Sequence, residues 1–192
     1  MAQIGASGEW TDADERKLRT SWVNEPPKLN GTVTLSEYDS NWPRLFSREA
    51  ARIREILTDR VLLCEHIGST AVPGLAAKPI IDILLVVPDP ADEDGYIADL
   101  ERHGYTLVIR EPDWYEHRAL KGPDTNINLH VYPPGSPEIG KYLRFRDHLR
   151  ASDADRRLYE DAKRRLAART WTYIQQYADA KDEVIAEIRR RA

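Results

Sequence analysis

The stretch EHIGSTAVPGLAAKPIIDILLVV, residues 65–87, contains two strand signals separated by small residues and prolines. Residues 80–87 form an almost continuous run of β-branched residues and leucine, which is typical of a central strand covered on both faces. Only Asp82 interrupts this apolar run. An earlier apolar segment, residues 61–67, predicts a second strand, and a loop or short helix is expected to follow it.

Upstream of this stretch, the chain predicts one strand and one long helix. Residues 32–35 alternate between polar and apolar side chains, as a strand does. Residues 39–41 supply helix-capping side chains, and Pro43 suits the first helical turn, where its missing N–H costs nothing. Apolar residues recur at steps of three and four from Trp42, so a helix that buries this stripe is expected to reach Asp59.

Downstream, the chain predicts a helix, three strands and then a helical segment. A helix is expected from the Pro-Asp-Pro turn at 88–90 to about His103, with Gly104 at its C-terminal end. Because most strands precede the cluster of helices, the expected fold class is α+β, with a mixed sheet, flanking helices and helices alone from about residue 137. The three strands are expected at 105–110, 114–120 and 126–132, and the last helices at about 138–151, 154–170 (capped by Asp153) and 173–190.

The length of 192 residues suits one domain with appendages. Residues 31–192 are interpreted as this domain. Residues 1–30 show weak periodicity and contain consecutive prolines, so a loosely ordered N-terminal extension is expected, in which residues 12–23 fit a few helical turns.

Composition excludes several classes of protein. Hydrophobic residues make up 41% and charged residues 31% of the chain, and the absence of a long uncharged apolar run excludes a membrane span. The one cysteine, Cys64, excludes an internal disulfide framework and a zinc site with several cysteines, and its apolar strand favours a buried structural thiol. The N-terminus lacks the basic start and apolar block of a signal peptide, so a cytoplasmic location is expected.

The net charge of -4 is unevenly distributed. Residues 141–192 carry 14 Lys+Arg and 9 Asp+Glu, a net charge of +5, which leaves -9 for the first 140 residues. Such a basic third suits nucleotide phosphates, nucleic acid or the acidic remainder of its own fold. Because it has no continuous Lys/Arg block interleaved with aromatic residues, nucleic acid is not expected as a general ligand.

Asp82 is the first candidate functional residue. A carboxylate in a central strand must be offset by a cation, a metal or hydrogen-bond donors, and a satisfied core polar group is the structural alternative. Gly68 and Ser69 follow the preceding strand, where small residues leave backbone N–H groups free to approach a phosphate. Together these residues predict a phosphate-binding turn beside an aspartate.

Residues 65–83, EHIGSTAVPGLAAKPIIDI, resemble the signature of the GrpB family, whose fold is similar to that of polymerase-beta-type nucleotidyltransferases. The resemblance extends over about residues 33–190 and implies a nucleotidyltransferase-like fold with a nucleotide as ligand. It is also carried by YDSNWP at 38–43, WYEHR at 114–118, NLHV at 128–131 and LRFRDHLR at 143–150.

The superfamily's chemistry implies Mg²⁺ bound by Asp82, a nucleoside triphosphate and a small-molecule acceptor. Nucleotidyl transfer commonly uses two metals held by an Asp-x-Asp pair and a third carboxylate. Residues two apart on a strand share a face, so the second position of the pair is Leu84, which is not a carboxylate. Two hypotheses follow: a nucleotidyltransferase with a single Mg²⁺, and a non-catalytic nucleotide-binding or interaction module with a degenerate acidic site. The oligomeric state is not predicted.

Two histidines are candidates for catalytic roles. In the strand 126–132, Asn128 and His130 share the polar face, and His130 is the candidate there. His66 precedes the Gly68 turn and is the second candidate, with a core imidazole bonded to a backbone carbonyl as the alternative.

Glu116 and Arg118 share one face of the strand 114–120, and His117 lies on the other. Glu116 is a candidate catalytic carboxylate and Arg118 a candidate phosphate clamp, whereas a cross-strand ion pair is the alternative for both. Asp82, His117 and His130 are a further alternative set, for a transition metal.

Further cations are candidates for binding an anionic nucleotide. These are Lys78 before the central strand, Arg144 and Arg146 on the helix 138–151, and Lys181 near the C-terminus. Solvated ion pairs, for which Asp147 is near enough in sequence, are the alternative for the arginines.

Overall fold

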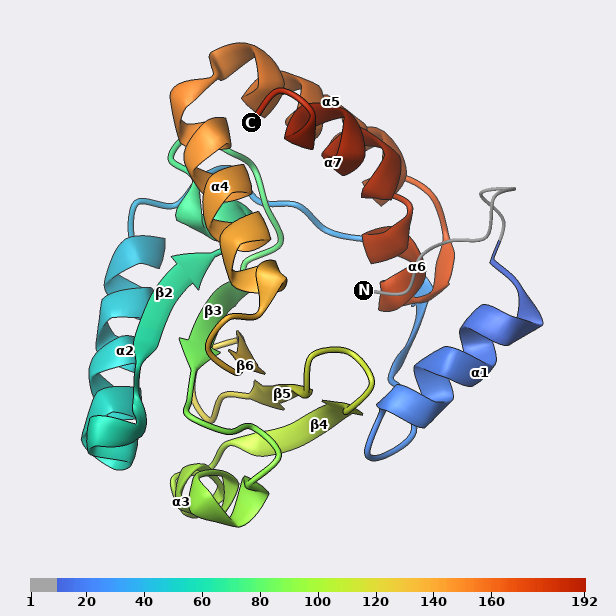
Figure 1. Ribbon diagram of the computed structural model, residues 1–192. Helices are drawn as coiled ribbons and strands as arrows, with labels where there is room; N and C mark the ends of the chain where they lie inside the picture. Colours follow the sequence, from blue (N-terminus) through green and yellow to red (C-terminus); the bar gives the residue numbers. More distant parts are fainter. Residues whose placement is uncertain (1–9) are drawn as a thin grey trace.

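The computed structural model describes residues 10–192, and its centre is a five-stranded mixed sheet with the strand order β2-β3-β6-β5-β4 (Figure 1). Strands β3 and β6 are parallel, and the other neighbours are antiparallel. A second, two-stranded sheet pairs β1 with β7. The strands are β1 (Lys28–Gly31), β2 (Leu63–Ile67), β3 (Ile81–Val86), β4 (Thr106–Glu111), β5 (His117–Lys121), β6 (Ile127–Tyr132) and β7 (Trp171–Tyr173).

Helices cover the five-stranded sheet on both sides. The inward stripe of α2 and the short α3 pack on one face, against the alternate residues Ile81, Ile83 and Leu85 of β3. The other face looks toward α4 to α7, which run over the top of the molecule, with α1 beside them (Figure 1). The helices are α1 (Asp12–Ser21), α2 (Trp42–Leu57), α3 (Ile97–Arg102), α4 (Pro137–Ala151), α5 (Asp153–Ala167), α6 (Ile174–Asp179) and α7 (Asp182–Arg189).

The α+β fold class with its mixed sheet and C-terminal helices is confirmed, and so is the long helix α2 that was predicted from its apolar stripe. Its capping differs from the prediction. The side chain of Asn41 caps no backbone N–H of the helix and accepts instead from the guanidinium of Arg44 at 2.9 Å. The carboxylate of Asp39 accepts from the N–H of Asn41 at 2.8 Å. The helix expected over 88–103 is shorter, because a 3-10 turn at Glu93–Gly95 precedes α3.

The strand expected at 32–35 is wrong by four residues. The strand β1 lies at Lys28–Gly31, because its partner β7 extends only over Trp171–Tyr173. Val33 is buried beyond this pairing, and its N–H donates to the carbonyl of Ala167 at 3.0 Å.

The last predicted helix, 173–190, is broken into β7, α6 and α7. The side-chain oxygen of Gln176 accepts hydrogen bonds from the N–H groups of Thr172 at 2.8 Å and Tyr173 at 2.9 Å, so it caps α6 and leaves the preceding residues extended. The cap of α5 is Ser152 and not Asp153, since the Ser152 hydroxyl accepts from the N–H of Asp155.

The N-terminal segment from residue 10 packs on the domain, which differs from the loose extension that the sequence suggested. The N–H of Val23 donates to the carbonyl of Val108 on β4 at 3.0 Å, and β1 adds the pairing with β7. Leu18 on α1 is buried. Residues 1–9 of the expected extension lie outside the described part of the chain.

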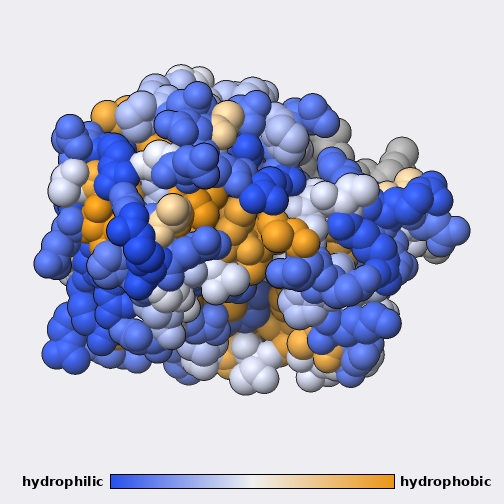
Figure 2. All heavy atoms as spheres, turned by 90° about the horizontal axis from the view of Figure 1, so that it is seen from below, coloured by the Kyte–Doolittle hydropathy of each residue, from blue (hydrophilic) through white to orange (hydrophobic). Residues whose placement is uncertain are grey.

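Viewed from below, the surface is mostly hydrophilic, and apolar side chains gather near the middle of this face (Figure 2). Over residues 10–192, no helix has the length and apolarity needed to cross a bilayer.

Candidate functional site

A cavity of about 360 Å³ adjoins the face of the sheet that α2 and α3 leave free. Its floor is formed by alternate residues of β3, β6 and β5, and its walls by the turn after β2, the C-terminal helices and α1. Trp10, Leu18 and Trp22 close the side next to α1. This volume falls in the range of small-molecule sites.

Three polar side chains cross the floor of the cavity in register. Asp82 pairs with Asn128, and Asn128 pairs with Lys121. The Asn128 amide donates to the Asp82 carboxylate at 2.7 Å, and the Lys121 ammonium donates to the Asn128 carbonyl at 2.6 Å. Burial raises the pKa of Asp82, against the lowering effects of the Asn128 hydrogen bond and of nearby lysines.

Gly68 lies directly against the Asp82 carboxylate. Its φ of 70° and ψ of -172° belong to a backbone region that glycine alone occupies readily. A Cβ added to Gly68 would lie 3.0 Å from the Asp82 Cβ and closer still to its Oδ2. The predicted turn therefore approaches the predicted aspartate, and Gly68 and Ser69 both line the cavity.

Four lysines surround this carboxylate or line the same cavity. Burial lowers the pKa of Lys78 to about 8 and that of Lys163 to about 7, and it also lowers those of Lys121 and Lys181. The Asp82 charge acts in the opposite direction on Lys78, Lys121 and Lys181. Among the described residues, none of the four forms a salt bridge, although Asp179 and Asp182 also act on Lys181. The surroundings of Asp82 are therefore cationic.

A chain of titratable groups lies farther along the same face. The Glu111 carboxylate is 2.7 Å from Nδ1 of His117, and Nε2 of His117 is 3.2 Å from Nδ1 of His130. The ring of His117 stacks on Tyr132 with a centroid distance of 4.7 Å. Burial alone would raise the pKa of Glu111, but the hydrogen bonds from His117 and Ser21 are among the effects that bring it to about 2, so Glu111 is ionised.

His66 lies away from the cavity, on the face covered by α2. Its ring stacks on Phe46 at 4.9 Å, and its Nε2 is 3.0 Å from the Thr70 hydroxyl. Burial, together with Arg150 and Arg146, lowers the pKa of His66 to about 4. This position corresponds to the core-imidazole alternative, with a hydroxyl in place of the backbone carbonyl.

Glu116 and Arg118 also lie outside the cavity, and they pair with each other. The pair is not the expected cross-strand pair, because β5 begins at His117 and not at residue 114, so Glu116 lies in the turn before the strand. The guanidinium of Arg118 contacts Glu116 at 3.3 Å and Glu93 at 2.7 Å. Arg118 faces this way because its register partner is Val131, whose side chain points into the core beneath α2 and α3. These residues stabilise the far face of the sheet.

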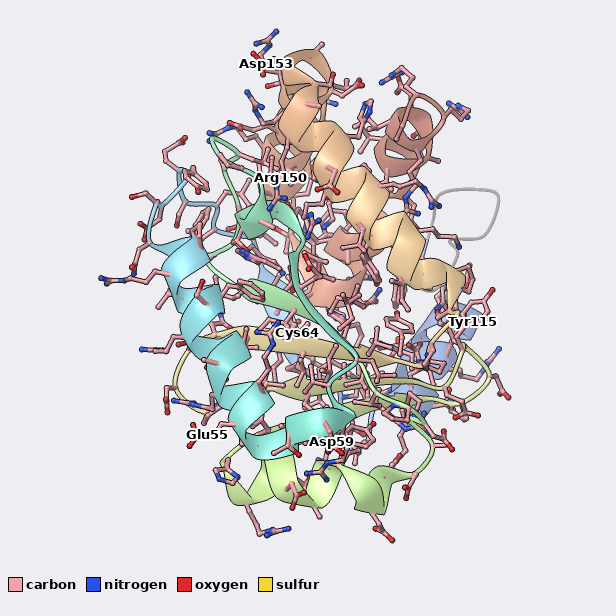
Figure 3. The ribbon with its side chains drawn as sticks, turned by 60° about the vertical axis from the view of Figure 1, so that its left-hand side comes forward. Glu55, Asp59, Cys64, Tyr115, Arg150 and Asp153 are labelled. Atoms are coloured by element: carbon pink, nitrogen blue, oxygen red, sulfur yellow. The ribbon has the colours of Figure 1, made fainter. Side chains whose placement is uncertain are left out.

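Two of the three arginines of α4, Arg146 and Arg150, have structural partners. Arg146 borders the cavity, but its guanidinium donates to Glu65 at 2.8 Å and to the carbonyl of His66 at 2.9 Å. Arg144 is exposed and lies over Gly140. Arg150 reaches from α4 to the segment after β2, where it donates to the carbonyl of Ala71 (Figure 3).

The donor set does not fit a protein-held divalent metal. Residue 84, which shares the face of Asp82, is the buried Leu84. Within residues 10–192, no group of three or more His, Cys, Asp or Glu side chains is arranged to hold a metal ion, so Asp82, His117 and His130 do not form a metal centre. The charged side chains that act on Asp82 are the lysines Lys78, Lys121 and Lys181.

Two residues of the site were missed in the sequence, Lys121 and Glu111. Lys121 ends β5, and its register opposite Asn128 follows from the short turn between β5 and β6. That turn was a usable signal. Glu111 ends β4, and its register opposite His117 follows in the same way from the short turn between β4 and β5.

The family model described as GrpB protein matches residues 32–191 of this chain. The chain belongs to the GrpB family. Among its relatives, a UPF0157 protein of Halalkalibacterium halodurans is 55% identical over 192 residues, which cover 100% of this chain and 98% of the relative. A UPF0157 protein of Streptomyces coelicolor is 45% identical over 160 residues, covering 83% and 84%.

A crystal structure of the conserved protein GrpB from Enterococcus faecalis has 34% identity to this GrpB-family chain and a TM-score of 0.73. The match covers 82% of this chain and 96% of that one. The family match begins after β1, so the cavity wall formed by α1 lies outside it, whereas Asp82, the lysines and the histidine pair lie inside it.

Proposed function

We propose that this GrpB-family protein binds a nucleotide in the cavity through its phosphates, as a non-catalytic binding module. The observation that carries the proposal is the set of lysines around one carboxylate. Lys78, Lys121 and Lys181 share Asp82, and burial lowers the pKa of each of them, which makes their charged forms less favourable. A phosphate group would supply the missing negative charge, and lysine is a common phosphate ligand.

The rival hypothesis is nucleotidyl transfer with Mg²⁺ at Asp82. It has in its favour the turn at Gly68 beside the carboxylate, which matches the resemblance to nucleotidyltransferases. The donor set speaks against it, because the position of the second carboxylate is Leu84 and the groups nearby are cations. We therefore favour binding without metal-dependent transfer.

Isothermal titration calorimetry with ATP, ADP, AMP and inorganic phosphate, each with and without Mg²⁺, tests the proposal. Binding is expected without Mg²⁺, with affinity that increases with the number of phosphates. Because an anion raises lysine pKa values, binding should also take up protons, which titrations in buffers of different ionisation enthalpy measure. Affinity should fall as the pH rises through about 8, where Lys78 loses its proton.

Lys121→Met and Lys141→Met form a matched pair of variants. Lys141 forms an ion pair with Glu138 on α4 and does not line the cavity. Lys121→Met is expected to weaken ATP binding about tenfold or more, since a hydrogen bond to a charged group contributes about 1.5–3 kcal/mol. Lys141→Met should bind like the wild type. No ATP binding by the wild type, or equal affinities of both variants, would reject the proposal, and release of pyrophosphate from ATP in Mg²⁺ would favour the transferase.

A further inference from the structure

The chain of Glu111, His117 and His130 fixes the position of every ring proton along it. Nδ1 of His117 donates to the ionised Glu111 carboxylate at 2.7 Å, so the neutral His117 ring has a lone pair on Nε2. Nδ1 of His130 lies 3.2 Å from this Nε2, so between two neutral rings it carries the proton that the lone pair accepts. The neutral His130 ring then has its own lone pair on Nε2. Burial supports neutral rings, since it lowers the pKa of His117 and brings that of His130 to about 3.

Nε2 of His130 opens on the cavity. His130 lines the cavity and is partly exposed, and no hydrogen bond to its Nε2 is formed by the described residues. This atom is also not among the buried polar atoms without a partner. The cavity thus contains a hydrogen-bond acceptor whose lone pair is held in place by two other side chains.

Nε2 of His130 lies at a defined distance from the lysines around Asp82. His130 follows Asn128 by two residues on the same face of β6, which corresponds to about 6.5 Å along the strand. The sugar of a nucleotide separates its hydroxyls from its 5′-phosphate by a comparable span. The rings of Tyr142 and Tyr132 flank this position, with centroids of His130 and Tyr142 6.2 Å apart.

We propose that Nε2 of His130 accepts a hydrogen bond from a ribose hydroxyl of the nucleotide bound at the lysines, with Glu111 and His117 as positioning residues. This inference rests on the proposed nucleotide binding. It assigns a sugar subsite and a preference for ribonucleotides, because a site built to bond a hydroxyl is left with an unpaired acceptor when the ligand lacks it.

Titrations with ATP and 2′,3′-dideoxy-ATP test the proposal. The wild type should bind ATP about tenfold more tightly, as expected for one hydrogen bond. His130→Phe keeps an aromatic ring without the acceptor, so it should bind both nucleotides with the weaker affinity. Equal wild-type affinities, or a preference for ATP that survives in His130→Phe, would overturn the sugar subsite and leave phosphate binding standing, whereas no binding of either nucleotide would reject both proposals.

Nitrogen-15 NMR of the histidine rings, recorded without ligand, tests the proton positions independently of whether His130→Phe folds. In the wild type, Nε2 of His130 should resonate as an unprotonated nitrogen and its Nδ1 as a protonated one. In Glu111→Ala, the ring protons of His117 and His130 should redistribute between the two nitrogens. A proton on Nε2 of His130 in the wild type would overturn the inference.

Discussion

Gly68→Ala tests whether the turn after β2 is matched to Asp82. The backbone of Gly68, with φ 70° and ψ -172°, disfavours any residue that has a Cβ. The added methyl group would also meet the Asp82 side chain, at 3.0 Å from its Cβ and 3.1 Å from its Cγ. Either the turn or the carboxylate must move, so both the stability of the fold and the shape of the cavity should change.

Gly74→Ala is the matched control. Gly74 also has a positive φ, 77°, but an added Cβ would have no atom within 4 Å. Both variants place an alanine at a positive φ, which costs about 1–3 kcal/mol. Gly68→Ala carries in addition the overpacking against Asp82, about 1–3 kcal/mol.

Urea unfolding followed by circular dichroism measures both free energies of unfolding. Gly68→Ala should lose about 1–3 kcal/mol more than Gly74→Ala. It should also bind ATP more weakly, because the displaced Asp82 carboxylate disturbs the row formed by Asn128 and Lys121. If the two variants lose the same stability, the contact between Gly68 and Asp82 does not constrain the site and the reasoning is refuted.

Three further predictions concern charged groups. Burial lowers the pKa of Lys163 to about 7. Between about pH 7 and pH 10 the unfolded chain therefore binds more protons than the folded one, and the free energy of unfolding rises with pH. Urea titrations should show a smaller rise for Lys163→Met, and an unchanged rise would contradict this. The hydrogen bonds from Arg191 and His148 hold the pKa of Asp155 at about 2, below its ordinary 3.8. Their stabilisation of the fold is therefore present above pH 4 and lost as the pH falls toward 2. Acid unfolding of Asp155→Asn should lack this loss, and a pH profile parallel to that of the wild type would refute the prediction. Asp82→Asn removes a negative charge from the lysines, so calorimetry should find ATP binding unchanged or tighter, whereas weaker binding would point to a metal held by the carboxylate.

The elements that the sequence predicted well are those whose signal is local. The continuous apolar run of β3 and the apolar stripe at steps of three and four in α2 are each visible within a single segment. Neither prediction therefore depends on a distant partner. The strand β1 was misplaced because its position is set by β7, which lies about 140 residues later. The break between β7 and α6 likewise depends on a cap and a strand pairing that no helical periodicity records.

The candidate site was predicted in part, and the errors at His66 and Arg118 have one cause. Alternation placed Asp82, Asn128 and His130 on one polar face, as the structure has them. Alternation does not say which of two faces looks toward the cavity when both carry polar residues. His66 and Arg118 were therefore selected although they lie on the α2 and α3 side, while Glu65 and His117 face the other way.

By itself, the amino-acid sequence determined the α+β class, the central strand with its single carboxylate and the glycine turn that follows β2. Each of these follows from the periodicity of apolar side chains or from the conformational freedom of glycine within a short segment. Tertiary structure alone decided that lysines from three separate segments converge on Asp82, and that Glu111 and His117 orient His130. The charge of a side chain and the position of its protons depend on distances between atoms of different strands and helices, and only the packing of these elements sets the distances.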